Sequence, residues 1–424
     1  MVVIAVLVGL LVLAAFAALH WFAWRRLVRD TTAGPGPARR AGTVLFAVAP
    51  VLVFAALVAE RAGAPFPLQQ ILAWPGFLWL ALSLYLLLAL LVGELVRPLL
   101  RRWVEARGRG TGGTVPAEQP VAAQTPVPVG AASPEPPSEE RTTASTTGPA
   151  PSRRLFVSRI VGGAVATAAV GTVGYGAYGV LSGPKVKRLT VPLAKLPRAA
   201  HGFRIAVVSD VHLGPILGRG FTQRVVDTIN STQPDLIAVV GDLVDGSVED
   251  LAPAAAPLAG LRARHGAYFV TGNHEYFSGA DQWVDHVREL GLRPLRNART
   301  ELPGFDLAGV DDVAGEDEGA GPDFAAALGD RDRARASVLL AHQPVVIHDA
   351  VEHGVDLQLS GHTHGGQLWP GNLVADLANP TLAGLERYGD TQLYVSRGAG
   401  AWGPPVRVGA PSDITVVELA SRHA

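Results

Sequence analysis

Five short clusters of polar residues between Val207 and His364 hold most of the side chains in this chain that could bind metal ions. Each cluster closes or directly follows a short apolar run of the length and composition of a β-strand. Seven oxygen and nitrogen ligands supplied from successive strand ends are typical of a hydrolytic centre that holds two metal ions. The clusters read Asp210-Val211-His212, Gly241-Asp242, Gly272-Asn273-His274-Glu275, His342 and Gly361-His362-Thr363-His364.

The candidate ligands combine two carboxylates with five neutral donors, as a two-metal centre requires. One carboxylate must bridge the ions, and mostly neutral ligands around it let a bound water become acidic. Asp210 and Asp242 supply the negative charge. This mixture suits borderline ions such as Mn, Fe or Zn better than Mg. The neutral donors are His212, Asn273, His342, His362 and His364.

His274 is expected to act on the substrate rather than on a metal ion. It directly follows Asn273, and adjacent side chains usually point in different directions. Over the substrate, its imidazole could protonate the leaving oxygen or stabilise developing negative charge. A single Asp or His after a strand could equally be a helix cap or a core residue. Five successive strand ends that each supply a ligand type exceed what such structural roles explain.

The elements that must position these residues form one α/β domain from Lys185 onward. The run FRIAVVS at residues 203–209 is nearly continuous in apolar residues, as in a strand covered on both faces. Strands that alternate with helices imply a layered α/β fold with the binding crevice at the carboxyl ends of the strands. The lack of helical patterns after about Val351 predicts a second, more antiparallel sheet. Further strands are predicted at 235–240, 267–271, 305–310, 337–341, 356–360, 392–396 and 414–419, and helices around 222–230, 251–262 and 281–290.

Composition limits the classes of function that need to be considered. The 424 residues include 36 Lys and Arg against 37 Asp and Glu, so no basic surplus indicates a nucleic-acid partner. The absence of cysteine excludes disulfides, thiolate zinc sites and cysteine nucleophiles. Hydrophobic residues make up 48% of the chain and charged residues only 17%, and the excess is concentrated towards the N-terminus. This distribution indicates membrane segments.

Residues 1–104 are predicted to form a membrane region with three transmembrane helices. Residues 2–24 are almost entirely apolar and long enough to cross the roughly 30 Å hydrocarbon core of a membrane. The runs at 43–59 and 71–93 are also apolar and are bounded by charged residues. Buried core helices are the alternative, but three such runs within a hundred residues favour the membrane. Residues 105–152 are rich in Pro, Thr and Ala, which predicts a disordered linker.

Residues 153–184 are predicted to hold a fourth transmembrane helix. Arg153 and Arg154 precede its apolar, Gly- and Ala-rich stretch, and the pair resembles a twin-arginine export signal retained as an anchor. An ordinary positively charged flank is the alternative. Arginines are abundant before this span, after the third span and between the first two, which places those flanks in the cytoplasm. The domain at residues 185–424 is therefore expected outside the cytoplasm, tethered close to lipid.

The ordered set Asp-x-His, Gly-Asp, Gly-Asn-His-Glu, His and Gly-His-x-His resembles the calcineurin-like metallophosphoesterase superfamily over roughly residues 200–420. The phrases SDVHLG, GDLVDGS, TGNHEY, LAHQP and LSGHTHGGQ resemble its membrane-associated YkuE-like branch, some members of which are exported by the twin-arginine route. The resemblance implies a four-layer α/ββ/α sandwich. The three N-terminal spans and the long linker lie outside this pattern.

The resemblance also implies a role for each candidate residue. Asp210, His212 and His364 would hold one metal ion, while Asn273, His342 and His362 would hold the other. Asp242 would bridge the two ions, and His274 would be the catalytic histidine. In the superfamily, a hydroxide that bridges two divalent ions attacks a phosphate ester or pyrophosphate bond.

The substrate is less defined than the chemistry. Tethering beside lipid favours a phospholipid or a lipid-linked pyrophosphate, whereas the breadth of the superfamily also permits a soluble phosphodiester or a nucleotide. Arg397 and Arg407 lie in a Gly- and Pro-rich region and could bind phosphate through paired donors, or could simply be loop charges. A catalytically silent metal-binding scaffold or sensor is the alternative function, but no ligand of the set is missing. The spans hold no array of ionisable residues that would indicate a transporter.

Overall fold

The computed structural model describes residues 2–109 and 153–422, which divide into two compact units. One unit takes in the described parts of Met1–Thr43 and Leu88–Ala166, and the other takes in Val44–Leu87 and Thr167–Ala424 up to residue 422. Most of the predicted linker, at 110–152, lies outside the described residues.

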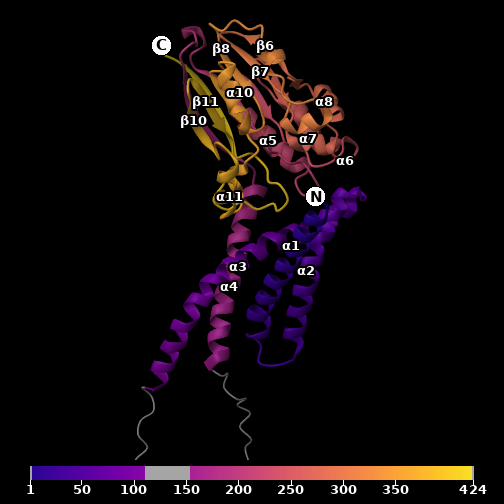
Figure 1. Ribbon diagram of the computed structural model, residues 1–424, viewed down its shortest axis with the longest axis vertical. Helices are drawn as coiled ribbons and strands as arrows, with labels where there is room; N and C mark the ends of the chain where they lie inside the picture. Colours follow the sequence, from indigo (N-terminus) through magenta and orange to yellow (C-terminus); the bar gives the residue numbers. More distant parts are fainter. Residues whose placement is uncertain (1, 110–152, 423–424) are drawn as a thin grey trace, which may run out of the picture. The chain divides into compact units, whose positions relative to one another are not determined.

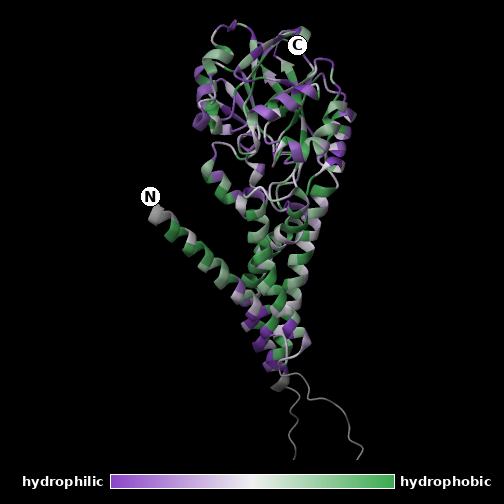
Figure 2. Ribbon diagram, turned by 90° about the vertical axis from the view of Figure 1, so that its right-hand side faces the viewer, coloured by the Kyte–Doolittle hydropathy of each residue, from purple (hydrophilic) through white to green (hydrophobic). Residues whose placement is uncertain are grey.

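Four helices of the described chain are long and apolar enough to cross a membrane (Figure 2). They contain the four predicted spans. The third helix runs to Arg109, past residue 105, where we predicted the linker to begin. Its last turns are rich in Leu, Arg, Glu and Ala, which favour a helix without any membrane around them. The helices are α1 (Val2–Trp24), α2 (Pro37–Arg61), α3 (Phe66–Arg109) and α4 (Arg153–Leu181).

The first unit contains a cluster of charges at the end of α1. A π-helical turn, Arg25–Arg29, follows α1 and carries Arg26, whose guanidinium lies 2.6 Å from the Glu94 carboxylate of α3. Asp30 lies 3.2 Å from the same guanidinium, and the buried Arg97 lies 3.2 Å from Glu94. Pairing of opposite charges offsets the cost of removing these groups from water.

The second unit contains the α/β domain, in which the described strands form two six-stranded sheets. In the first sheet β2 to β5 are parallel neighbours, and β12 runs antiparallel to β2 and parallel to β1. Its order is β1 (Lys185–Leu193), β12 (Asp413–Ser421), β2 (Phe203–Val208), β3 (Leu236–Val240), β4 (Ala267–Val270) and β5 (Arg293–Pro294). The second sheet has the order β10 (Gly384–Tyr388), β11 (Thr391–Val395), β9 (Leu357–Ser360), β8 (Ala336–Leu340), β7 (Phe305–Gly309) and β6 (Ala298–Leu302).

The two sheets pack face to face, and helices cover their outer faces (Figure 1). Alternate residues of β2, such as Ile205 and Val207, face the second sheet, while Ala206 and Val208 face the helices. The predicted four-layer α/ββ/α sandwich is confirmed. The first sheet is covered by α5 (Arg219–Ser231), α6 (Val248–Ala255) and α8 (Ala280–Glu289), and the second by α9 (Phe324–Leu328) and α10 (Ile347–Glu352).

Our prediction for the end of the domain was right about the sheet and wrong about the helices. Two of the five strand pairs in the second sheet are antiparallel, against one of five in the first, although its inner strands β7, β8, β9 and β11 are parallel neighbours. A helix, α11 (Gly371–Ala378), does follow Val351. Its sequence GNLVADLA is bounded by Pro370 and by Asn379-Pro380, so its composition resembles a loop. Parallel neighbours require crossover connections, which the short helices α9, α10 and α11 contribute to.

Candidate metal centre

The carboxyl ends of five strands meet at one edge of the sandwich and carry the candidate ligands. Asp210 and Asp242 follow β2 and β3, and Asn273 begins the short helix α7 (Asn273–Ser278) after β4. His342 and His362 follow β8 and β9 of the second sheet. Since β2, β3 and β4 are parallel to one another, as are β8 and β9, their ends lie side by side.

The backbone at this edge is unusual because several ligands adopt left-handed conformations. Eight non-glycine residues of the described chain have a positive φ, and five of them are candidate ligands. Such conformations cost free energy and are commonly retained where function needs them. The backbone strain therefore coincides with the candidate site. The five residues are Asp210, His212, Asp242, His362 and His364, with φ between 49° and 72°.

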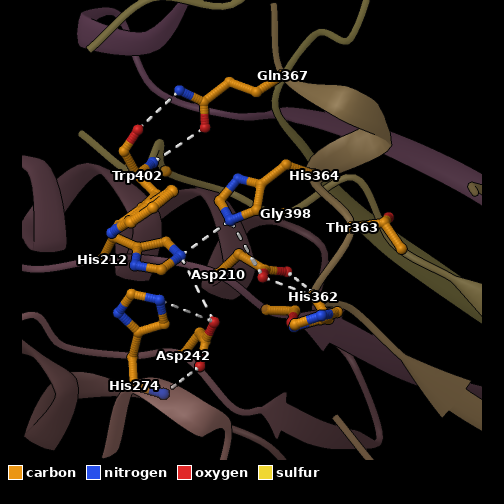
Figure 3. Close-up of polar contacts among 12 residues, drawn as sticks. Asp210, His212, Asp242, His274, His362, Thr363, His364, Gln367, Gly398 and Trp402 are labelled. Carbon is orange, nitrogen blue, oxygen red and sulfur yellow. Dashed lines mark hydrogen bonds and ion pairs between the residues drawn. The ribbon is translucent and has the colours of Figure 1, made fainter. Parts of the chain in front are cut away.

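Asp210, His212 and His364 form one compact, buried group that could hold a metal ion (Figure 3). The His364 Nε2 atom lies 3.4 Å from Asp210 Oδ1 and 2.9 Å from His212 Nε2. Asp210 is completely buried and accepts the backbone N–H of His362 at 3.0 Å. This group matches the set predicted for the first ion.

Asp242, His342 and His362 form a second such group. The His342 Nε2 atom lies 3.1 Å from Asp242 Oδ2, and His362 Nδ1 lies 3.0 Å from the Asn273 side-chain oxygen. The same Asp242 oxygen lies 3.8 Å from His212 Nε2 of the first group. Asp242 thus stands between the two groups, where a bridging carboxylate is expected.

The chemistry of His342 fits a bound cation. Its Nδ1 atom hydrogen-bonds the Val240 carbonyl at 2.8 Å, which leaves Nε2 directed at the Asp242 carboxylate. Among the described residues this buried Nε2 atom has no hydrogen-bond partner. Burial lowers the pKa of His342, but the negative charges of Asp242 and Asp210 raise it well above its ordinary value. Positive charge is therefore stabilised here, and a metal ion would replace the proton.

The two histidines of the Gly-His-x-His cluster favour the neutral form that ligates metals. Burial and the neighbouring His342 lower the pKa of His362 to about 4. Burial, with His212 and Arg407 nearby, lowers the pKa of His364 well below its ordinary value. Both side chains are therefore neutral at neutral pH, the form in which an imidazole ligates a metal ion. Nitrogen and oxygen donors without thiolates fit the borderline divalent ions predicted from the sequence.

His274 lies at the exposed side of the centre. Its Nε2 atom is 3.9 Å from Asp242 Oδ2, so it also belongs to a group with metal-binding spacing. Its ring, however, contacts the rings of Phe277 at 5.6 Å and Trp402 at 5.7 Å between centroids. Both aromatic residues are exposed, which places His274 at the mouth of the site.

Asp245 is a site residue that the sequence analysis missed. Its Oδ1 atom lies 2.9 Å from His212 Nδ1 and 2.6 Å from His274 Nδ1, so one carboxylate orients both rings. Burial lowers the pKa of His274, but the hydrogen bond and charge of Asp245 raise it to about 9. The available signal was a second Asp three positions after Asp242 in GDLVDG.

Glu275 also has a role that its sequence position did not reveal. Its buried carboxylate accepts backbone N–H groups from Gly272 at 2.6 Å, Leu243 at 2.7 Å and Asp242 at 3.0 Å. These bonds tie the ends of β3 and β4 together. Burial and the charge of Asp242 raise the pKa of Glu275 to about 7.

The two arginines predicted to bind substrate have different surroundings. Arg407 is 5% exposed and donates to the carbonyls of Gly400 at 2.6 Å and His364 at 3.1 Å. Its Nη2 atom lies 3.0 Å from His364 Nδ1, so the fold uses its guanidinium behind a ligand. Arg407 is thus a positioning residue rather than the substrate contact that we predicted. Arg397 is half-buried and 3.9 Å from Asp413, which leaves its prediction open.

The family model described as calcineurin-like phosphoesterase matches residues 203–366. A metallophosphoesterase of Helicobacter pylori, described as uncharacterized, is 37% identical over 64% of this chain and 74% of its own length. A zebrafish (Danio rerio) transmembrane protein with metallophosphoesterase domain is 37% identical over 58% of this chain and 59% of its own length. The uncharacterized metallophosphoesterase YkuE of Bacillus subtilis is 30% identical over 64% of this chain and 99% of its own length.

Proposed function

The chain belongs to the calcineurin-like metallophosphoesterase family, and from that premise we propose that it is a membrane-anchored hydrolase of phosphate esters or pyrophosphates with two divalent ions. The carrying observation is the pair of ligand groups with Asp242 between them and His274 at their exposed side. Four apolar helices and the similarity to transmembrane relatives support the membrane anchor.

The residues of each group would hold one ion, with Asp242 between them. Two bound divalent ions supply an acidic water and neutralise the charge that develops on a phosphoryl group. Asp210, His212 and His364 form the first set. Asn273, His342 and His362 form the second, since Asn273 contacts His362.

The chain itself supplies the proton for the leaving oxygen. His274 is held by Asp245 with its Nε2 atom on the side of Asp242, and its raised pKa keeps it protonated at neutral pH. A protonated imidazole beside the leaving oxygen can act as general acid. The backbone N–H of His274 donates to Asp242 Oδ1 at 2.9 Å, which fixes the position of the carboxylate relative to the acid.

The domain is proposed to lie outside the cytoplasm. The α4 span begins at Arg153 and Arg154 and ends at Leu181, four residues before β1. Positively charged flanks favour the cytoplasmic side, so the opposite end of this span and the domain after it would be outside. Cleavage by an added protease in intact cells supports this placement, and full protection of the domain contradicts it.

Hydrolysis of a generic substrate tests the proposal. The full chain in detergent, loaded with Mn²⁺, should hydrolyse an aryl phosphate monoester or diester, and a chelator should stop the reaction. His274→Ala should lose turnover, whereas His348→Ala, an exposed histidine away from the site, should not. A folded, metal-loaded chain that hydrolyses neither ester would instead favour a silent metal-binding scaffold.

A further inference from the structure

Helix α11 exposes an apolar face close to the metal centre. None of its eight described residues is buried, and Leu373, Val374 and Leu377 are 61%, 71% and 88% exposed. Positions i, i+1 and i+4 lie on one side of a helix. Trp369, just before the helix, is 51% exposed. We call Trp369, Leu373, Val374 and Leu377 the apolar strip. Clustered exposed apolar residues of this kind mark an interaction surface.

The apolar strip is attached to the candidate metal centre. The turn that leads to the strip starts at the ligand His364. Asn372, at the start of α11, packs so closely on Gly366 that a Cβ added to Gly366 would collide with the Asn372 backbone. Gln367 then exchanges two hydrogen bonds with the Trp402 backbone, at 2.9 Å and 3.0 Å (Figure 3). Since the Trp402 ring contacts His274, a chain of direct contacts joins the strip to the mouth of the site.

The same segments are attached to the membrane spans of their unit. The Tyr85 hydroxyl of α3 donates to the Trp369 carbonyl at 3.0 Å. The Phe77 ring of α3 packs beside Gly403: a Cβ added to this glycine would lie 3.8 Å from the ring. The Arg407 backbone N–H donates to the Gly176 carbonyl of α4 at 3.3 Å. The loops beside the mouth therefore adjoin residues that belong to spans rather than to the α/β domain.

The turn between α2 and α3 also reaches the site. Phe66, the first residue of α3, packs against the core beneath the helices of the first sheet. The Glu60 carboxylate, one residue before the end of α2, interacts electrostatically with Asp245 and His274. A span ends where the membrane meets water. Both observations bring the turn between α2 and α3 close to the mouth of the site.

We propose that the apolar strip lies in the lipid leaflet next to the domain and that the metal centre acts on phosphate groups carried by lipids in that leaflet. The substrate class rests on the proposed function, whereas the position of the strip does not. Trp and Tyr favour the boundary between lipid and water, and an amphipathic helix buries its apolar side there. The headgroup of a lipid would meet the site without leaving the membrane.

The charges of α11 indicate whether the helix would bind a membrane through its apolar side chains or through electrostatic attraction to anionic lipids. The charged residue of α11 is Asp376, and the helix carries neither Lys nor Arg. Binding through basic residues to anionic lipids weakens with salt, whereas burial of apolar area does not. Immersion of the strip should therefore be the same in zwitterionic membranes and at high salt.

The depth of the strip can be measured because the chain contains no cysteine. Leu377→Cys carries a spin label in the full chain, reconstituted in phosphatidylcholine nanodiscs. Asp330→Cys, 83% exposed before the amino end of β8 and thus at the edge opposite the metal centre, provides the water-exposed control. We expect the label at 377 to be relaxed by oxygen in the lipid and shielded from a water-soluble nickel chelate, unlike the control. Equal access of the chelate to both labels would overturn the proposal, as would a label shielded by dimerisation without oxygen relaxation.

The substrate class is tested with the triple variant L373S/V374S/L377S and the control Val186→Ser. Nanodiscs would carry a phospholipid or a polyprenyl pyrophosphate, and a soluble aryl phosphate would serve as reference. The triple variant should lose at least about tenfold in the rate on the membrane substrate relative to the aryl phosphate. An unchanged ratio would refute the lipid substrate. If the wild type hydrolyses nothing, the proposed function fails, while the spin-label result still decides the position of the strip.

Discussion

The metal centre and the apolar strip are close in the chain but differ in every physical respect. His364 and Trp369 are five positions apart. The first is buried and paired with Asp210, His212 and Arg407, whereas the second is half-exposed and has a backbone bond to a membrane span. One region collects polar atoms away from water, and the other presents apolar atoms to it.

This contrast separates the features of the site that the domain stabilises by itself from those that need a surrounding phase. Buried polar groups need polar partners, and hydrogen bonds of Asp242, Asp245 and Glu275 within the domain hold most of the ligand cluster in place. The apolar strip is not stabilised in this way, because exposed apolar side chains lower their free energy only when another apolar phase removes them from water. Changes in the cluster should therefore alter chemistry on any substrate, while changes in the strip should alter chemistry on membrane substrates alone.

The largest expected effect comes from the carboxylate that the two ligand groups share. Asp242→Asn removes the charge beside His342 and His212, so rates on soluble and membrane substrates should both fall at least about 1,000-fold. Elemental analysis should show fewer bound metal ions per chain. Retained activity on a soluble substrate would contradict the assignment of hydrolysis to the ligand cluster.

Asp245→Asn should act on both the rate and its pH dependence. The rate should fall by about 10- to 100-fold, as for residues that orient ligands. Asp245 raises the pKa of His274 to about 9, so its loss lowers that pKa. A general acid works when protonated, and activity of the variant should therefore decline at a lower pH than that of the wild type. An alkaline limb that does not move in a pH–rate profile would show that His274 is not the acid.

The sequence predicted the ligand edge well for a physical reason. Parallel strands bring their carboxyl ends to one edge, so residues after β2, β3 and β4 had to become neighbours once the strands were recognised. Asp245 and Glu275 could not be assigned in the same way, because their partners are set by turns rather than by strand period. Asp245 reaches two histidines from segments 33 and 29 positions away in sequence.

Other features depended on packing that one-dimensional patterns do not contain. Arg407 looks like a loop charge in the sequence, yet packing against the His364 turn makes it a buried donor. Helix α11 was missed because Asn, Asp and Pro in and around it favour loops, and because none of its apolar residues is buried by the described chain. Our sequence criteria for a helix assumed a protein core on one side, which α11 does not have.

Gly398→Ala tests how closely the ligand cluster is packed around Asp210. Gly398 has a φ of +83°, and an added Cβ would lie 2.6 Å from the Asp210 Cβ. Strain of this kind costs about 1–3 kcal/mol, and displacement of Asp210 should weaken metal binding. Thermal unfolding with and without Mn²⁺ would measure both effects. Gly291→Ala, with a similar φ and open space around it, provides a control for backbone strain alone.

The smallest expected effect distinguishes the two arginines. Arg407→Lys keeps the charge but loses the fork of donors that holds the His364 and Gly400 carbonyls, so metal affinity should fall by about tenfold. Arg397→Lys is the matched change at a half-buried arginine with a loose ion pair, and its metal affinity should stay within about twofold. Calorimetric titration with Mn²⁺ would measure both variants. If instead Arg407→Lys raised KM and left metal affinity unchanged, Arg407 would contact substrate, and the boundary between buried cluster and exposed surface would lie elsewhere.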